Sequence, residues 1–139
     1  MKKINLDSEK VLAIIAIIVS LSATVMEGLV LLKILPYDII GGGRMESYEK
    51  AAALAVFSII MQLFLVYCIA VASNIFYNHK FQKIAVTVLR VFVVYFAINI
   101  VMNLLGTTLL EKVYGSISCL VQIVCFTLII RSRKQEYCG

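Results

Sequence analysis

Apolar residues gather in four long runs along this chain, separated by short polar segments. The runs cover about residues 11–32, 51–77, 84–105 and 110–130. A helix needs roughly 20 mostly apolar residues to cross about 30 Å of hydrocarbon, and each run approaches or exceeds that length. None of the runs alternates with a period of two, as transmembrane strands do. The pattern therefore predicts an all-α protein with four membrane-spanning helices.

The polar segments predict how these helices are connected. Residues 78–83 and 106–112 read as tight turns, and only residues 34–50 have room for structure of their own. Short connections make neighbouring helices antiparallel. Pro36 is expected to end the first helix, because proline cannot continue the helical hydrogen bonding. We expect one domain over residues 1–139, a transmembrane up-down four-helix bundle.

Composition narrows the class of protein. The chain has 139 residues, of which 62% are hydrophobic and 15% charged, and its mean hydropathy is +0.98. Soluble domains are about 45–50% apolar and about 25% charged. These values exclude a disordered chain, a secreted disulfide scaffold and an ordinary cytosolic enzyme. They indicate an integral membrane protein with little mass outside the bilayer.

The distribution of lysine and arginine predicts the orientation. Twelve of these residues flank the spans, and Arg90 lies within the third span. One side holds Lys2, Lys3, Lys10, Lys80, Lys83, Arg131, Arg133 and Lys134, and the other holds Lys33, Arg44, Lys50 and Lys112. Because cytoplasmic loops carry the excess of positive charge, both termini are expected in the cytoplasm. Basic residues on the inner face attract anionic lipid headgroups. The net charge of +5 therefore needs no nucleic-acid partner to explain it.

The cysteine and histidine positions argue against catalysis, cofactors and metal binding. The four cysteines include no Cys-x-x-Cys pair, and His79 is the only histidine. A thiol oxidase needs such a pair, and a zinc site needs several ligands at suitable spacing. The candidate nucleophiles Ser116, Ser118 and Cys119 have no histidine base at their depth. We expect no enzyme, no cofactor and no metal site.

Polar residues within the spans mark the candidate site. Glu27 falls in the outer third of the first span, and Asn99 and Asn103 fall at similar height in the third. Gln62 and Gln122 fall near mid-membrane in the second and fourth spans. Two interpretations stay open. In the first, the polar side chains form interhelical hydrogen bonds worth about 0.6 kcal/mol each. In the second, they line an outward-opening cavity with Glu27 as its charged or protonatable group.

The outer segment contains a second candidate site. Gly41–Gly43 are three consecutive glycines, which allow positive φ and a concave group of backbone N–H donors. Arg44 follows directly, so the segment is suited to a carboxylate or phosphate. It lacks the Lys and Ser/Thr of a nucleotide-binding loop. The alternative is a tight turn in which Arg44 bridges Asp38, Glu46 or Glu111.

Several of these positions resemble a group of uncharacterised small bacterial four-span membrane proteins. That group has an outer loop of the form Tyr-Asp-x-Ile/Val-Trp-Gly-Gly-Arg, an Asn-x-x-Gly-Asn pattern in the third span and a Glu-Lys pair before the fourth. The matching residues are Tyr37, Asp38, Ile40, Gly42, Gly43, Arg44, Asn99, Asn103, Glu111 and Lys112, whereas Gly41 replaces the tryptophan and Met102 the glycine. The resemblance implies that the loop, both asparagines and Glu111 form one unit at the outer face of a bacterial inner membrane.

These observations predict a non-enzymatic membrane protein. It would bind a lipid or small ligand in an outer-facing polar pocket, or serve as an accessory subunit of a membrane complex. The expected ligand-binding residues are Glu27, Asp38, Gly42, Gly43, Arg44, Asn99, Asn103 and Glu111, above a polar layer of Gln62 and Gln122. The expected partners are membrane lipids and a second copy or a larger complex. The alternative is a small dimeric proton-coupled transporter that uses Glu27.

Overall fold

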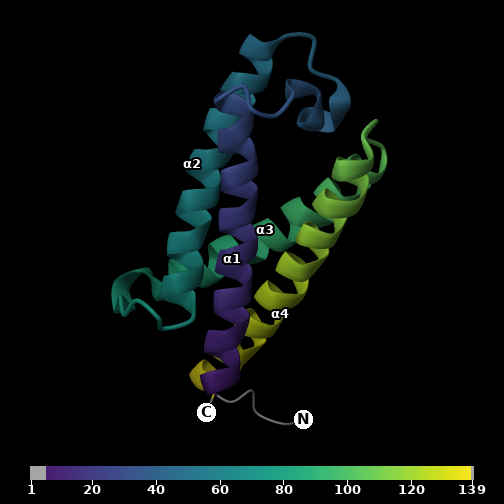
Figure 1. Cartoon of the computed structure of the whole chain (residues 1–139). Coiled ribbons are helices and arrows are strands. Elements are labelled where there is room, and N and C mark those ends of the chain that lie inside the picture. Colours follow the sequence, from purple (N-terminus) through teal and green to yellow (C-terminus); the bar gives the residue numbers. More distant parts are fainter. Residues whose placement is uncertain (1–5, 139) are drawn as a thin grey trace.

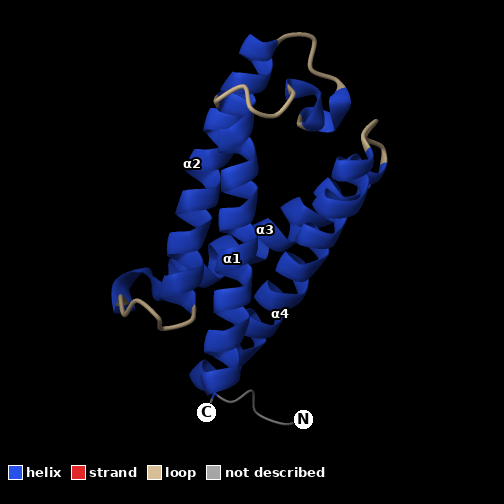
Figure 2. Ribbon diagram, in the orientation of Figure 1, coloured by secondary structure: helices blue, strands red, loops and turns tan. Residues whose placement is uncertain are grey.

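Four long helices make up most of the computed structural model, which describes residues 6–138 (Figures 1 and 2). They are α1 (Leu6–Leu31), α2 (Tyr48–Ala72), α3 (His79–Leu104) and α4 (Ser116–Cys138). All four are long and apolar enough to cross a membrane. No strand occurs in the described part of the chain. The predicted all-helical class is confirmed, and four helices have the length and apolar character of the predicted spans. Lys2 and Lys3, which entered the charge count, lie outside the described residues.

Large apolar side chains cover much of the outside of the bundle. Large hydrophobic side chains such as Ile18, Val94 and Leu120 are exposed on the outside of the helices. Between the helices the buried residues include small ones, among them Ala13 and Ala16. Lipid-facing helices bury their small side chains and expose their large apolar ones. The chain therefore has the exterior of a multi-pass membrane protein.

The helices form two pairs that diverge from one end of the bundle to the other. α1 packs mainly along α2, and α3 packs mainly along α4. Figure 1 shows the pairs meeting where α1 begins and α4 finishes, and separating toward the opposite end. We call the first the terminal end and the second the loop end. The segment between α1 and α2 lies at the loop end, where it carries two short 3-10 turns, η1 (Tyr37–Ile39) and η2 (Gly41–Gly43).

α1 ends earlier than the position of Pro36 predicts. The helix stops at Leu31, and Lys33 adopts a positive φ of 58°. The Ile34 N–H then donates to the Leu29 carbonyl at 2.9 Å. A left-handed residue that turns the chain back onto its last carbonyls is a common way to end a helix. The proline follows a helix that has already terminated.

α2 also ends before its predicted limit at Tyr77. It finishes at Ala72, and Asn74 has a φ of 56°. The Ser73 hydroxyl donates to the Ile69 carbonyl at 2.6 Å. Asparagine tolerates the left-handed region better than other non-glycine residues, so it ends the helix here. The apolar residues that follow Asn74 extend the hydropathy run but not the helix.

A buried polar network closes the terminal end. Glu9 of α1 and Arg133 of α4 form an ion pair in which both side chains are almost fully buried, and Ser132 also donates to Glu9. One end of the Asn74 amide lies 2.6 Å from Gln82 Nε2 of α3. Its other end carries the amide oxygen, which accepts from Arg133 Nη1 at 2.8 Å. The network ties α1, α3 and α4 to the turn that follows α2.

Candidate functional site

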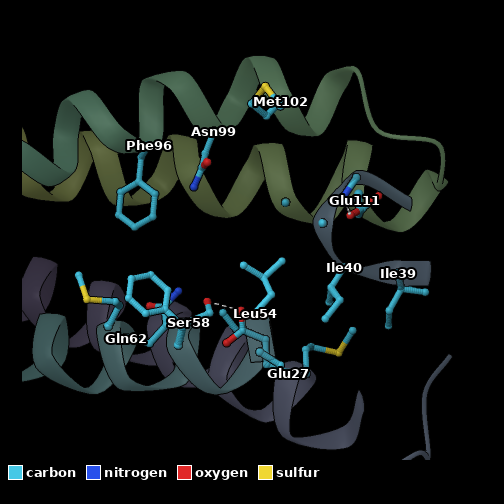
Figure 3. Close-up of a pocket in the computed structure, with 18 of the residues that line it drawn as sticks. Glu27, Ile39, Ile40, Leu54, Ser58, Gln62, Phe96, Asn99, Met102 and Glu111 are labelled. Atoms are coloured by element: carbon cyan, nitrogen blue, oxygen red, sulfur yellow. Dashed lines mark hydrogen bonds between the residues drawn. The ribbon is translucent and has the colours of Figure 1, made fainter. Parts of the chain in front are cut away.

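A cavity of about 590 Å³ lies between the two helix pairs at the loop end (Figure 3). Its walls come from α1, α2, α3, the loop after α1 and the π-helical turn η3 (Glu111–Gly115) that leads into α4. The apolar lining includes Met26, Leu54, Phe57, Met61, Val91, Phe92, Tyr95, Phe96 and Met102. The polar lining includes Glu27, Arg44, Ser58, Gln62, Asn99, Glu111 and Tyr114. A mostly apolar chamber of this size with a few polar groups is typical of a small-molecule site.

Glu27 lines this cavity from α1, one helical turn before that helix ends at Leu31. One of its carboxylate oxygens accepts a hydrogen bond of 2.5 Å from the Ser58 hydroxyl of α2, which Figure 3 marks as a dashed line. The other oxygen, Oε2, is buried and has no hydrogen-bond partner. Most buried polar atoms in proteins are hydrogen-bonded, so this oxygen is an exception that calls for an explanation.

Gln62 and Asn99 extend the polar surface around Glu27. Gln62 lies one helical turn beyond Ser58 on α2, and its Oε1 is also buried without a partner. Asn99 points toward the cavity from α3, on the opposite wall in Figure 3. We call Glu27, Ser58, Gln62 and Asn99 the polar belt. The belt contains two unused acceptors inside an otherwise apolar chamber.

The belt differs from the predicted polar layer, because Gln122 is not part of it. Gln122 is buried between α1 and α4, where its Nε2 donates to Ser20 Oγ at 2.7 Å and to the Ala16 carbonyl at 3.0 Å. Gln122 thus joins α1 to α4 through its Nε2, although its Oε1, like that of Gln62, is buried without a partner. Gln62 lines the cavity. The two glutamines therefore lie at similar depth in the bundle but in different surroundings.

Asn103 is also separated from the cavity. Its amide lies against Gly115, where a Cβ would come within 2.7 Å of Asn103 Nδ2, and Nδ2 lies 3.7 Å from the Cys119 sulfur. Residues four apart on a helix differ by about 40° in direction, since one turn takes 3.6 residues. That rotation directs Asn99 to the cavity and Asn103 to α4.

The glycine segment forms the roof of the cavity. Gly41, Gly42 and Gly43 have φ values of 68°, 77° and 68°, which confirms the predicted positive φ. The Gly42 N–H donates to Glu111 Oε1 at 2.6 Å, and the Gly42 carbonyl accepts from the Thr107 N–H at 3.2 Å. The carboxylate at the glycine turn is therefore supplied by the chain itself. The loop is clamped onto the α3–α4 connection.

Glu111 is held on both of its oxygens. Its side chain is buried, and Oε2 accepts from Thr108 Oγ1 at 3.1 Å. Gly106 makes room for it, because a Cβ there would lie 3.0 Å from Glu111 Oε2. With its oxygens engaged by Gly42 and Thr108, Glu111 holds the roof in place.

The remaining loop candidates lie at the rim or outside the cavity. Arg44 is exposed at the rim, with its Nη2 3.4 Å from the Leu105 carbonyl. It forms no ion pair within the described residues, whereas Glu46 pairs with Lys50. Asp38 is exposed and does not line the cavity. Gly43 packs against Thr107 rather than against the cavity.

Several residues of the site were missed by the sequence analysis. Ser58 supplies the single partner of Glu27, and Ser58 and Gln62 are spaced four apart, a polar stripe that the sequence displays. Tyr114 binds α1 through a 2.6 Å hydrogen bond between its hydroxyl and that of Ser22. The aromatic residues of α3 that line the cavity could not be recognised from the sequence, because aromatic side chains occur on every face of membrane-spanning helices. The Glu9–Arg133 pair was missed because both residues sit at the polar ends of their spans.

The polar groups of the site are few, and their chemistry can be stated residue by residue. No group of three His, Cys, Asp or Glu side chains suited to a metal comes together among residues 6–138. The belt offers hydrogen-bond acceptors, a carboxyl group and aromatic faces in a chamber roofed by backbone. No family model matches this chain, and no curated protein or solved structure matches it either.

Proposed function

We propose that this chain is a non-enzymatic membrane protein that binds a lipid or small ligand in the cavity at its loop end. The observation that carries the proposal is the pair of buried acceptors, Glu27 Oε2 and Gln62 Oε1, which have no partner in an apolar chamber. A buried polar group left unsatisfied costs about 1–3 kcal/mol. A bound molecule that donates hydrogen bonds to these atoms removes that cost.

In the proposed orientation the loop end lies outside the cell and both termini lie in the cytoplasm. The support is the excess of Lys and Arg at the terminal end, which retains that end on the cytoplasmic side. The cavity then opens toward the outer leaflet of the plasma membrane. The resemblance to small bacterial four-span proteins implies that this is a bacterial inner membrane. The unit of loop and Glu111 that the resemblance implies is supported by the Gly42–Glu111 hydrogen bond.

Native mass spectrometry of the chain released from nanodiscs tests this proposal. Asn99→Phe fills the cavity, whereas Ile98→Phe places the same ring on the neighbouring position, which is 58% exposed on the outside of α3. We expect a retained mass on the wild-type chain and on Ile98→Phe, and its loss on Asn99→Phe. A wild-type chain without a retained mass, or equal retention by both variants, would contradict the proposal.

The alternative functions give different spectra. A wild-type chain that appears bare and monomeric supports an accessory subunit that has lost its partner. A dimer supports the proton-coupled transporter, which is favoured by the placement of Glu27 in the cavity. For a transporter, Glu27→Gln would abolish proton-coupled flux in proteoliposomes. A transporter must also open the cavity to the opposite side of the membrane. The Glu9–Arg133 ion pair at the terminal end would then have to separate.

A further inference from the structure

We infer that the ligand of this cavity is an amphiphile whose head carries a primary ammonium group, bound at the polar belt. The inference rests on the proposed function and specifies its ligand class. It combines three features: the unused acceptors, the aromatic wall and the side of the cavity that faces lipid.

The unused acceptors define what the head must provide. Glu27 Oε2 and Gln62 Oε1 both require a donor, and Ser58 already donates to the other Glu27 oxygen. A primary ammonium has three N–H donors and the charge that complements a carboxylate. A sulfate or phosphate at the same place would meet the carboxylate of Glu27. Within the cavity lining the only Lys or Arg is Arg44, at the rim.

The aromatic wall supports a cation in the same chamber. Phe92, Tyr95 and Phe96 of α3 form a cluster with ring centroids 5.6–5.8 Å apart, and all three line the cavity. The faces of such rings attract cations, most strongly when the cation is desolvated. The same rings provide a rigid apolar surface for a hydrocarbon tail. One wall thus suits both parts of an amphiphile.

The cavity faces lipid on the side between α2 and α3. Phe57 of α2 and Val91 and Tyr95 of α3 line it and are also 62%, 63% and 52% exposed. Residues that belong to both the cavity and the lipid-facing surface form its lateral edge. The roof of Ile39–Gly42 covers the cavity at the loop end. An amphiphile therefore enters sideways from the bilayer, with its tail remaining toward lipid.

The ammonium group has two sources, an aminophospholipid of the bilayer or a free long-chain amine. Arg44 at the rim offers a guanidinium to the phosphate that accompanies the ammonium in an aminophospholipid. The belt makes the same contacts with either molecule. The experiment therefore separates the sources by the composition of the bilayer.

Fluorescence quenching by amphiphiles of matched length measures the head-group preference. The chain contains no tryptophan, so Phe57→Trp provides a single reporter at the cavity wall. Phe81→Trp provides a matched reporter on α3 near the terminal end, where Phe81 is exposed. The probes are tail-brominated dodecylammonium, dodecanol and dodecyl sulfate, added to nanodiscs of phosphatidylcholine. Native mass spectrometry with the same probes on the unaltered chain checks that the reporter has not changed the site.

We expect saturable quenching by dodecylammonium at position 57 and only non-saturable partitioning at position 81. Replacing Glu27 by Gln in the Phe57→Trp background should weaken that binding about tenfold or more, because a buried charged hydrogen bond is lost. Glu49→Gln makes the same chemical change at an exposed position outside the cavity and should leave binding unchanged. The alcohol and the sulfate should bind more weakly than the amine.

Equal saturable binding of all three probes, or equal effects of Glu27→Gln and Glu49→Gln, would overturn the ammonium inference while leaving the cavity as a binding site. Absence of saturable binding by every probe, together with an empty wild-type chain in the mass spectrum, would overturn the proposed function itself. Exchanging phosphatidylcholine for phosphatidylethanolamine identifies the source. A weaker apparent affinity for dodecylammonium supports ammonium recognition with an aminophospholipid as occupant, and an unchanged affinity supports it with a free amine.

Discussion

Two glutamates on one face of α1 have opposite surroundings. Glu9 and Glu27 are eighteen residues apart, which is five helical turns, so they point in the same direction from the helix. At the terminal end Glu9 is buried against Arg133 and Ser132. At the loop end Glu27 has only the Ser58 hydroxyl, and one of its oxygens has no partner. The same side chain completes a structural network at one end and borders a cavity at the other.

The difference comes from the neighbouring helices rather than from α1. At the terminal end α4 provides a guanidinium, which matches a carboxylate in charge and in the number of donors. At the loop end α2 provides one hydroxyl, and the two helix pairs have separated enough to leave about 590 Å³ of space. A buried charge without a full set of partners is costly in a membrane and is usually functional. This difference supports the proposal that Glu27, and not Glu9, contacts a ligand.

The largest effect should follow from breaking the terminal network. Arg133→Met leaves Glu9 buried without its cation and should lower the free energy of unfolding by about 3–5 kcal/mol. Equilibrium unfolding in mixed micelles with increasing dodecyl sulfate measures the loss. Arg131→Met, at an exposed position two residues away, is the control and should change little. Adding Glu9→Leu to Arg133→Met should recover much of the stability, and failure to recover would contradict a pairing role.

The roof of the cavity should be the next most sensitive element. Gly43→Ala should cost about 2 kcal/mol, because φ is 68° and the new Cβ would lie 1.7 Å from Thr107 Oγ1. Gly28→Ala is the matched control, because no atom lies within 4 Å of a Cβ there. It should be neutral or stabilising, since alanine favours the helix. The same unfolding titration compares the two, and equal destabilisation would show that the roof does not constrain Gly43.

The two glutamines provide a smaller contrast. Gln122→Leu removes the hydrogen bonds to Ser20 and Ala16 and should cost about 1 kcal/mol. The oxygens of both glutamines are buried without a partner, but Gln62→Leu removes no bond like those of Gln122 Nε2 and should change stability by less than about 0.5 kcal/mol. Binding should respond in the opposite order, with Gln62→Leu weakening retention of the ligand and Gln122→Leu sparing it. Equal stability losses would contradict the separation of the two residues.

The sequence predicted the helices well and the contacts between them poorly. Apolar runs indicate how many spans a chain has, and three consecutive glycines allow the positive φ that the loop adopts. Glu27 and Asn99 could be placed near one another by depth. The partners of Gln122 and Asn103 depend on how each helix is rotated against its neighbours, and depth says nothing of that rotation. The burial of Arg133 was hidden for a similar reason, because a basic residue at a span end ordinarily reaches into the headgroups.

Reagent access to two serine positions tests the central claim most directly. In a chain whose four cysteines are replaced by alanine, Ser58→Cys places a thiol in the polar belt, and Ser20→Cys places one in the fully buried α1–α4 contact. A lipid-soluble thiol reagent that partitions into the bilayer is added to intact cells. The account predicts that Ser58→Cys is labelled, that dodecylammonium slows this labelling, and that Ser20→Cys is not labelled. Resistance of Ser58→Cys to the lipid-soluble reagent, or equal labelling of both positions, would contradict a ligand cavity that is open to the bilayer.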